Sequence, residues 1–113
     1  MKVMFISDLH GSYYWANRAI EKYHEEKADK LIILGDILYH GPRNDLPKDY
    51  NCKKVIALLN PLKKDIIAVR GNCDSEVDQM VLDFPMRSDY ALMDIDQHHF
   101  FMTHGHLFNE DQL

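Results

Sequence analysis

Long apolar runs are absent from this sequence. A helix that crosses a bilayer needs about 20 consecutive apolar residues, and no stretch of the chain approaches that length. The N-terminal apolar run 3–6 meets Ser7 and Asp8 after only four residues. That is too short for the hydrophobic region of a signal peptide. The sequence therefore predicts a cytoplasmic location and no contact with a membrane.

Cysteine and positive charge are also scarce. The two cysteines, Cys52 and Cys73, form no CxxC pattern, and nothing else indicates secretion, so we expect free thiols. The chain has 13 Lys and Arg against 18 Asp and Glu, which gives a net charge of -5. This balance argues against non-specific nucleic-acid binding, which requires Lys and Arg to displace counterions from phosphates. An anionic substrate would need positive charge from another source, such as a metal ion.

The order of apolar runs predicts alternating strands and helices in one α/β layered domain that covers residues 1–113. The chain has no internal repeat, and its hydrophobic content of 46% is ordinary for a globular protein. Strands are expected at residues 2–7, 30–34 and 66–69, followed by a hairpin of 90–96 and 99–103 with its turn at 97–98. Helices are expected at 13–26 and 53–60, a short helix or turn at 76–84, and a long loop at 37–50.

Polar stretches follow the predicted strands at the point where each strand ends. They are Asp8-Leu9-His10-Gly11, Gly35-Asp36, Gly71-Asn72-Cys73-Asp74 and Thr103-His104-Gly105-His106. In parallel α/β sheets, ligands bind outside the carboxyl ends of the strands. The first three stretches all fall at that edge, so their side chains are expected to lie near one another.

These side chains are suitable metal ligands as a group. Mixed carboxylate and imidazole ligands suit Mn, Fe, Zn, Ni or Co, and two such ions can activate water and hold a phosphoryl group. Each residue alone has an ordinary explanation. Asp8 could cap a turn, Asn72 could occupy a left-handed turn, and His104 could be a core histidine. The combination at the ends of separate strands is far more specific than any single member.

The motif set resembles the calcineurin-like metallophosphoesterase superfamily, and within it the small bacterial phosphodiesterases. The resemblance rests on Asp8-x-His10, Gly35-Asp36, Gly71-Asn72-x-Asp74 and Thr103-His104-Gly105-His106, together with Gly41-Pro42-Arg43-Asn44. It implies an α/β/β/α sandwich that hydrolyses small phosphodiesters at a two-metal centre. It also implies two divalent transition metals, with Mn the leading candidate and Zn, Ni, Fe or Co as alternatives.

The resemblance assigns roles to individual residues. It implies that Asp8 and His10 bind the first metal, that Asp36 bridges both metals, and that Asn72 and His104 bind the second. Asp36 and Asn72 are the candidate catalytic residues, and Asn72 is also expected near a phosphate oxygen. Substrate contact or support of the ligands is expected from His40, Arg43, Cys73, Asp74 and His106.

Two features depart from the family pattern. Many relatives have a histidine where this chain has Cys73, and a thiol is a poor general acid for an alkoxide; Cys73 could equally be a small buried residue. The family also ends its motif series with Gly-His-x-His, which supplies one further ligand to each metal. No such motif follows His106. We therefore expect an incomplete domain, truncated at the C-terminus, with a partial metal site.

The missing part leads to further expectations. Three protein ligands and water can form a working zinc site. Six-coordinate Mn would need more water ligands, so we expect it to bind more weakly. We expect the chain to have low or no catalytic turnover. The inner face of the first sheet should be exposed, and such apolar patches favour association. We expect a homo-oligomer through this face. The alternatives are a weak or inactive fragment, and a scaffold of the same fold that acts through protein contacts.

Overall fold

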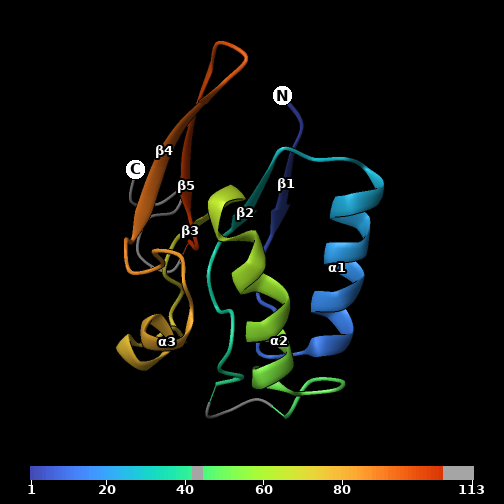
Figure 1. The fold of residues 1–113 in the computed structure, drawn as a ribbon. Coiled ribbons are helices and arrows are strands. Elements are labelled where there is room, and N and C mark those ends of the chain that lie inside the picture. The colour runs from blue at the N-terminus through green and yellow to red at the C-terminus, as the bar shows by residue number, and fades with distance from the viewer. Residues whose placement is uncertain (42–44, 106–113) are drawn as a thin grey trace.

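The computed structural model describes residues 1–41 and 45–105. Its centre is a parallel sheet of three strands in the order β1-β2-β3 (Figure 1). The strands are β1 (Val3–Ile6), β2 (Lys30–Ile33) and β3 (Ile66–Ala68). Leu31 pairs with Met4 on one side and with Ile66 on the other. The three predicted strands and the mixed α/β fold are confirmed.

Helices cover one face of this sheet. They are α1 (Tyr13–Glu25) and α2 (Cys52–Leu59), and α2 continues into a 3-10 helix, η1 (Asn60–Asp65). The predicted cap at Ser12 is confirmed, because its side chain accepts a hydrogen bond from the Trp15 N–H. A short helix, α3 (Glu76–Val81), ends before residue 84, the predicted limit, because Leu82 is already extended.

The hydrophobic core lies between the sheet and these helices. Alternate strand residues face it, as the twofold periodicity of strands requires. Leu31 and Ile33 of β2 are fully buried there against Ala16 of α1 and Val55 of α2. This packing holds the carboxyl ends of the three strands in register, which positions the loops that follow them.

An antiparallel hairpin forms the second sheet of the described residues. It consists of β4 (Tyr90–Ile95) and β5 (His98–Thr103). The predicted turn at 97–98 is wrong by one residue, because Ile95 pairs with His98 and the loop is Asp96-Gln97. Both loop residues have positive φ, 49° and 73°, as a two-residue hairpin turn of the favoured twist requires.

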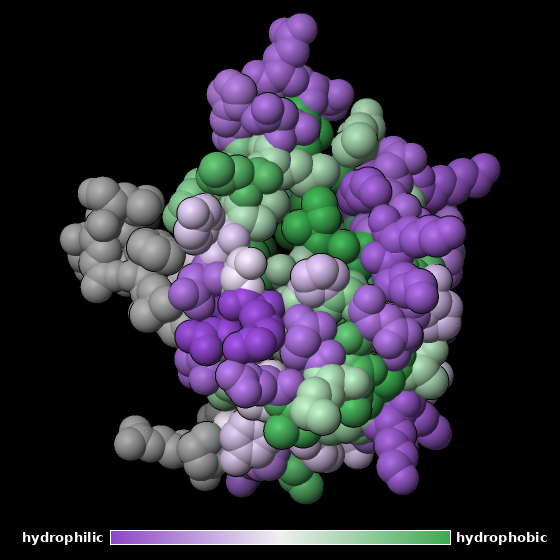
Figure 2. Space-filling model, turned by 60° about the vertical axis from the view of Figure 1, so that its left-hand side comes forward, coloured by the Kyte–Doolittle hydropathy of each residue, from purple (hydrophilic) through white to green (hydrophobic). Residues whose placement is uncertain are grey.

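The second face of the parallel sheet is only partly covered. Ile32 is fully buried, whereas Phe5 is 43% exposed and its ring lies 6.5 Å from that of Phe100 in the hairpin. The hairpin also exposes Leu92 and Phe101. Figure 2, with the hairpin side turned forward, shows apolar side chains reaching the surface among hydrophilic ones. The inner face of the first sheet, which the sequence predicts to be exposed, is therefore only partly exposed, and the hairpin adds exposed apolar side chains of its own.

Two other expectations can be compared with the described residues. None of their helices is long and apolar enough to cross a membrane. Cys52 and Cys73 are free thiols, as predicted. The long loop expected at 37–50 forms no helix or strand in its described parts, apart from an isolated bridge between Tyr50 and Ser12.

Candidate metal centre

The loops after β1 and β2 are hydrogen-bonded to each other along their backbones. The N–H groups of Asp8 and His10 donate to the carbonyl oxygens of Gly35 and Asp36 at 3.1 and 2.9 Å. Asp8, His10 and Asp36 all have positive φ, at 58°, 50° and 54°. Such a conformation costs a non-glycine residue of the order of 1–3 kcal/mol and is concentrated at functional sites. Three of the five predicted ligands are thus held in an unfavourable backbone conformation.

The predicted ligand atoms converge around Asp36. Its Oδ2 lies 3.7 Å from His10 Nε2 and 3.2 Å from His104 Nε2. His10 Nε2 is 3.2 Å from Asp8 Oδ1, and His104 Nε2 is 2.9 Å from Asn72 Oδ1. Ligands about 2.0–2.2 Å from a metal ion lie roughly 3–3.6 Å from one another. The spacings of these atoms, 2.9–3.7 Å, are close to that range.

Both imidazoles are oriented by backbone carbonyl groups. His10 Nδ1 donates to the carbonyl oxygen of Tyr39 at 2.8 Å, and His104 Nδ1 donates to that of Leu34 at 2.7 Å. A carbonyl oxygen can only accept, so Nδ1 carries the proton in each neutral ring. Nε2 is then the unprotonated nitrogen that faces the cluster. A backbone carbonyl on the remote nitrogen is the usual support for a metal-binding histidine.

The chemistry of the facing atoms fits a cation. In the neutral rings, the Nε2 lone pairs of His10 and His104 point at oxygens of Asp8, Asp36 and Asn72. All of these atoms are acceptors when the carboxylates are ionised. Acceptors at such distances repel one another unless a proton or a metal ion lies between them. Within residues 1–41 and 45–105, two groups could hold an ion: Asp8 with Asp36 and His104, and His10 with Asp36 and Cys73.

A buried carboxylate, Asp74, holds the third loop against the second. Its Oδ2 accepts hydrogen bonds from the N–H groups of Asp36 and Gly71, both at 2.7 Å, and its Oδ1 accepts from Ile37 at 3.0 Å. Asp74 is only 8% exposed. Its carboxylate therefore supports the backbone of Asp36 and does not face the cluster, which gives the supporting role expected from the sequence a specific structural basis.

The third loop approaches Asp36 very closely at Gly71. A Cβ atom on Gly71 would lie 2.2 Å from Asp36 Oδ1, and no side chain fits there. The N–H of Cys73 in the same loop donates to Asp36 Oδ1 at 2.7 Å. One oxygen of Asp36 is thus occupied by the protein backbone, and the other faces the two imidazoles.

The pKa values of the two carboxylates shift in opposite directions. Burial raises the pKa of Asp8, but the Ser7 hydroxyl, which donates at 2.6 Å, and the positive charge of His104 and His10 in their protonated forms outweigh it, and the net pKa is lowered. Burial raises the pKa of Asp36, and the charges of Asp74 and Asp8 raise it further. The pKa of Asp36 stays elevated despite the N–H of Cys73. Positive charge beside Asp36 would therefore be stabilising.

The remaining predicted residues lie around or outside this cluster. Cys73 is half-buried beside Asp36, and burial raises the pKa of its thiol, which keeps it protonated at neutral pH. The ring of His40 lies against the rings of Tyr39 and Tyr50, at 5.1 and 5.4 Å between centroids, rather than among the ligand atoms. Arg43 and His106, the other two predicted contacts, lie outside the described residues.

Sequence reasoning missed three groups that shape the cluster. They are the carbonyl groups of Leu34 and Tyr39, which orient the imidazoles, and the hydroxyl of Ser7, which donates to Asp8. A backbone carbonyl carries no residue-type signal, so no pattern could have identified the first two. Ser7 stands directly before Asp8, and that adjacency was the available signal.

Comparison with known proteins agrees with the motifs and the fold. The calcineurin-like phosphoesterase superfamily domain matches residues 1–113. Phosphodiesterase YfcE of Escherichia coli K12 is 49% identical over 113 residues, which are 100% of this chain and 61% of that protein. The solved structure of E. coli YfcE, described as a phosphoesterase, superposes on this chain with a TM-score of 0.97. The match covers 100% of this chain and 62% of that one.

A more distant structure shows the same fold. A novel archaeal phosphodiesterase is 27% identical, with a TM-score of 0.66, and the match covers 94% of this chain and 60% of that one. The present chain thus spans about three fifths of the relatives that it matches. Because one family model covers its full length, the chain belongs to the calcineurin-like phosphoesterase superfamily.

Proposed function

We propose that this chain carries the metal-binding part of a phosphodiesterase that acts on small phosphodiesters through two divalent metal ions. The observation that supports this most directly is the convergence of acceptor atoms at Asp36, 2.9–3.9 Å apart, from four separate loops. Calcineurin-like phosphoesterases use divalent metal ions. Mn is the leading candidate, with Zn, Ni, Fe or Co as alternatives. We include the cytoplasmic location expected from the sequence in this proposal.

Each proposed ion would have its own set of protein ligands, with Asp36 shared between them. Asp8, His10 and Asp36 would hold one ion, and Asp36, Asn72 and His104 the other. Bound ions would supply a water of lowered pKa and positive charge opposite the phosphate oxygens. The exposed Asn72 amide, whose Nδ2 makes only a long contact of 3.7 Å with Cys73 Sγ, would donate to a phosphate oxygen.

A metal titration tests this proposal on the chain itself. Addition of Mn to the metal-free chain is expected to raise its melting temperature, because an ion that binds only the native state stabilises it. A chromogenic aryl phosphodiester should then be hydrolysed slowly, and Mg should substitute poorly for Mn. No change in melting temperature with any of the five transition metals would refute the metal centre. Binding without hydrolysis would support the alternative, an inactive domain of this fold.

We also propose that copies of the chain associate through the hairpin. Leu92 and Phe101 pair across the hairpin and therefore share one of its faces, where they are 72% and 43% exposed; exposed apolar side chains grouped in this way mark association sites. Replacing Leu92, the most exposed of them, by Glu should shift the molecular mass measured by light scattering toward the monomer. Val77→Glu on α3, at another exposed apolar position, is the control. A monomeric parent chain would contradict association.

A further inference from the structure

Three basic side chains lie against aromatic rings at the start of α1 and α2. Lys48 Nζ lies 3.8 Å from the centroid of the Tyr14 ring, and the Arg18 guanidinium lies 5.4 Å from the same ring. Lys54 Nζ lies 5.3 Å from the centroid of the Tyr13 ring. We define the cation–aromatic surface by these residues and Trp15: Tyr13, Tyr14, Trp15, Arg18, Lys48 and Lys54.

The charge of this surface is unusual for the chain. The protein has a net charge of -5, and the exposed Lys22 of α1 pairs with Glu25 and Glu26. Among the residues that the structure describes, Arg18, Lys48 and Lys54 pair with no carboxylate. Three cations without acidic partners on an acidic protein form a local site for an anion.

The aromatic side chains add a flat surface to this positive charge. Trp15 is 54% exposed, and its ring meets that of Tyr14 edge-on at 4.8 Å. Between α1 and α2, a hollow of about 290 Å³ is lined by Tyr13, Lys54, Ala57 and Leu58. This combination of charge, rings and an apolar floor suits a phosphate that carries a planar base.

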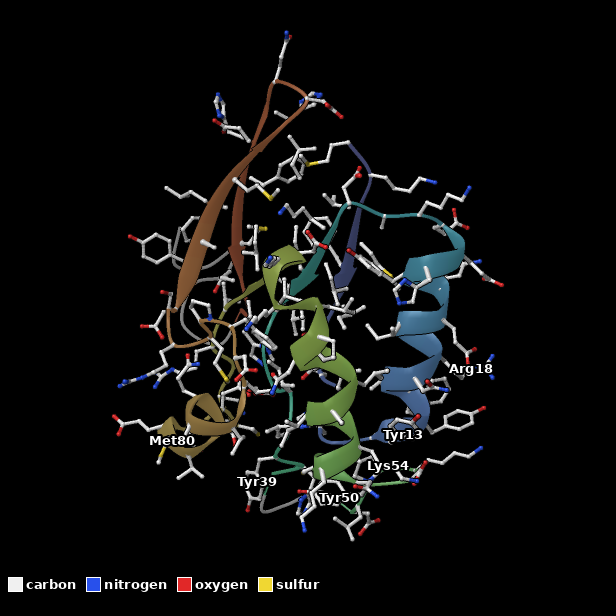
Figure 3. All side chains as sticks on the ribbon, in the orientation of Figure 1. Tyr13, Arg18, Tyr39, Tyr50, Lys54 and Met80 are labelled. Carbon is white, nitrogen blue, oxygen red and sulfur yellow. The ribbon has the colours of Figure 1, made fainter. Side chains whose placement is uncertain are left out.

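The cation–aromatic surface lies close to the candidate metal centre. Tyr13 follows His10 by three residues, so their Cα atoms lie at most about 11 Å apart. The backbone at Lys48 and Asp49 is hydrogen-bonded to the start of α1. Ser12 Oγ donates to the Lys48 carbonyl at 2.5 Å, and the Tyr13 N–H donates to the Asp49 carbonyl at 2.9 Å. Figure 3 labels Tyr13 and Lys54 at the lower ends of α1 and α2, with Arg18 further along α1.

From this geometry we propose that the cation–aromatic surface binds a nucleotide moiety of the phosphodiester substrate, with its phosphate near Lys54 and its base against the aromatic side chains. The substrate class is then a short nucleotide diester. The proposal rests on the phosphodiesterase function proposed above. It concerns one or two nucleotides and agrees with the overall negative charge, which disfavours non-specific binding of long nucleic acids.

Tryptophan fluorescence tests the binding directly, because Trp15 is the single tryptophan of the chain. A thymidine dinucleotide added in excess EDTA, which prevents metal-dependent hydrolysis, is expected to quench this fluorescence. Lys54→Gln should weaken the apparent affinity at least about fivefold, because it removes a charged contact to the phosphate. Lys53→Gln, an exposed neighbour on α2 with no aromatic contact described, should bind like the parent chain.

The outcomes separate this proposal from the phosphodiesterase proposal. Equal affinity of the parent and Lys54→Gln would overturn the nucleotide site, as would equally tight binding of tripolyphosphate, which has charge but no base. With Mn present, the ratio of kcat/KM for a dinucleotide to that for an aryl diester should fall in Lys54→Gln and not in Lys53→Gln. If neither diester is hydrolysed, the phosphodiesterase proposal fails, and the EDTA titration still decides the nucleotide site.

Discussion

Replacing Asp36 by Asn is expected to abolish divalent-metal binding and to reduce phosphodiester hydrolysis at least about 10³-fold. Asp36 Oδ2 faces both His10 and His104, so a single substitution removes negative charge from both proposed ion sites. The amide keeps an oxygen that can accept from the Cys73 N–H, as Asp36 Oδ1 does at 2.7 Å. The shape of the loop is therefore retained while its charge is lost.

The same substitution has a second, opposite effect that makes the test specific. Burial and the neighbouring charges of Asp74 and Asp8 raise the pKa of Asp36. Ionised Asp36 therefore destabilises the metal-free fold at a pH above that raised pKa. At neutral pH, Asp36→Asn should leave the metal-free melting temperature unchanged or raise it, while Mn no longer raises it further. Asp83→Asn, an exposed control, should keep the Mn response. An Asp36→Asn chain that Mn still stabilises would contradict the bridging role.

Replacing Asp74 by Ala is expected to destabilise the fold by at least about 3 kcal/mol, because three backbone N–H groups lose their acceptor. Those donors belong to Asp36, Ile37 and Gly71, and all three bonds are buried. No other described carboxylate receives three backbone N–H groups. Loss of these bonds would also release Asp36, so metal binding should weaken together with stability.

Urea unfolding of the metal-free chain measures the effect, through the midpoint and the slope of the transition. Asp83→Ala is the matched control, since it removes a carboxylate of the same length from an exposed position and should change the free energy of unfolding by less than about 0.5 kcal/mol. Similar midpoints for the two variants would show that the Asp74 hydrogen bonds contribute little. Asp74→Asn should fall between them, because its amide can accept from some of the three donors but carries no charge.

Much of the candidate centre could be predicted from residue order alone. Asp8, Asp36 and Asn72 each follow an apolar run by a few residues, and the carboxyl ends of neighbouring parallel strands meet at one edge of a sheet. Two local facts, strand polarity and distance from the strand end, are sufficient to place them together. The same reasoning failed at the hairpin turn, because a shift of one residue changes neither composition nor hydrophobicity, and only the pairing of Ile95 with His98 determines the loop.

The sequence by itself determined the order of strands and helices, the identity of the candidate ligands and the family. Only the tertiary structure decided how those ligands are held. Tyr39 and Leu34 orient His10 and His104 from 29 and 70 residues away in the chain, and Asp74 reaches Asp36 across 38 residues. The grouping of Arg18, Lys48 and Lys54 around two tyrosine rings also joins separate segments. Local patterns encode which elements form, whereas contacts between distant segments depend on how those elements pack.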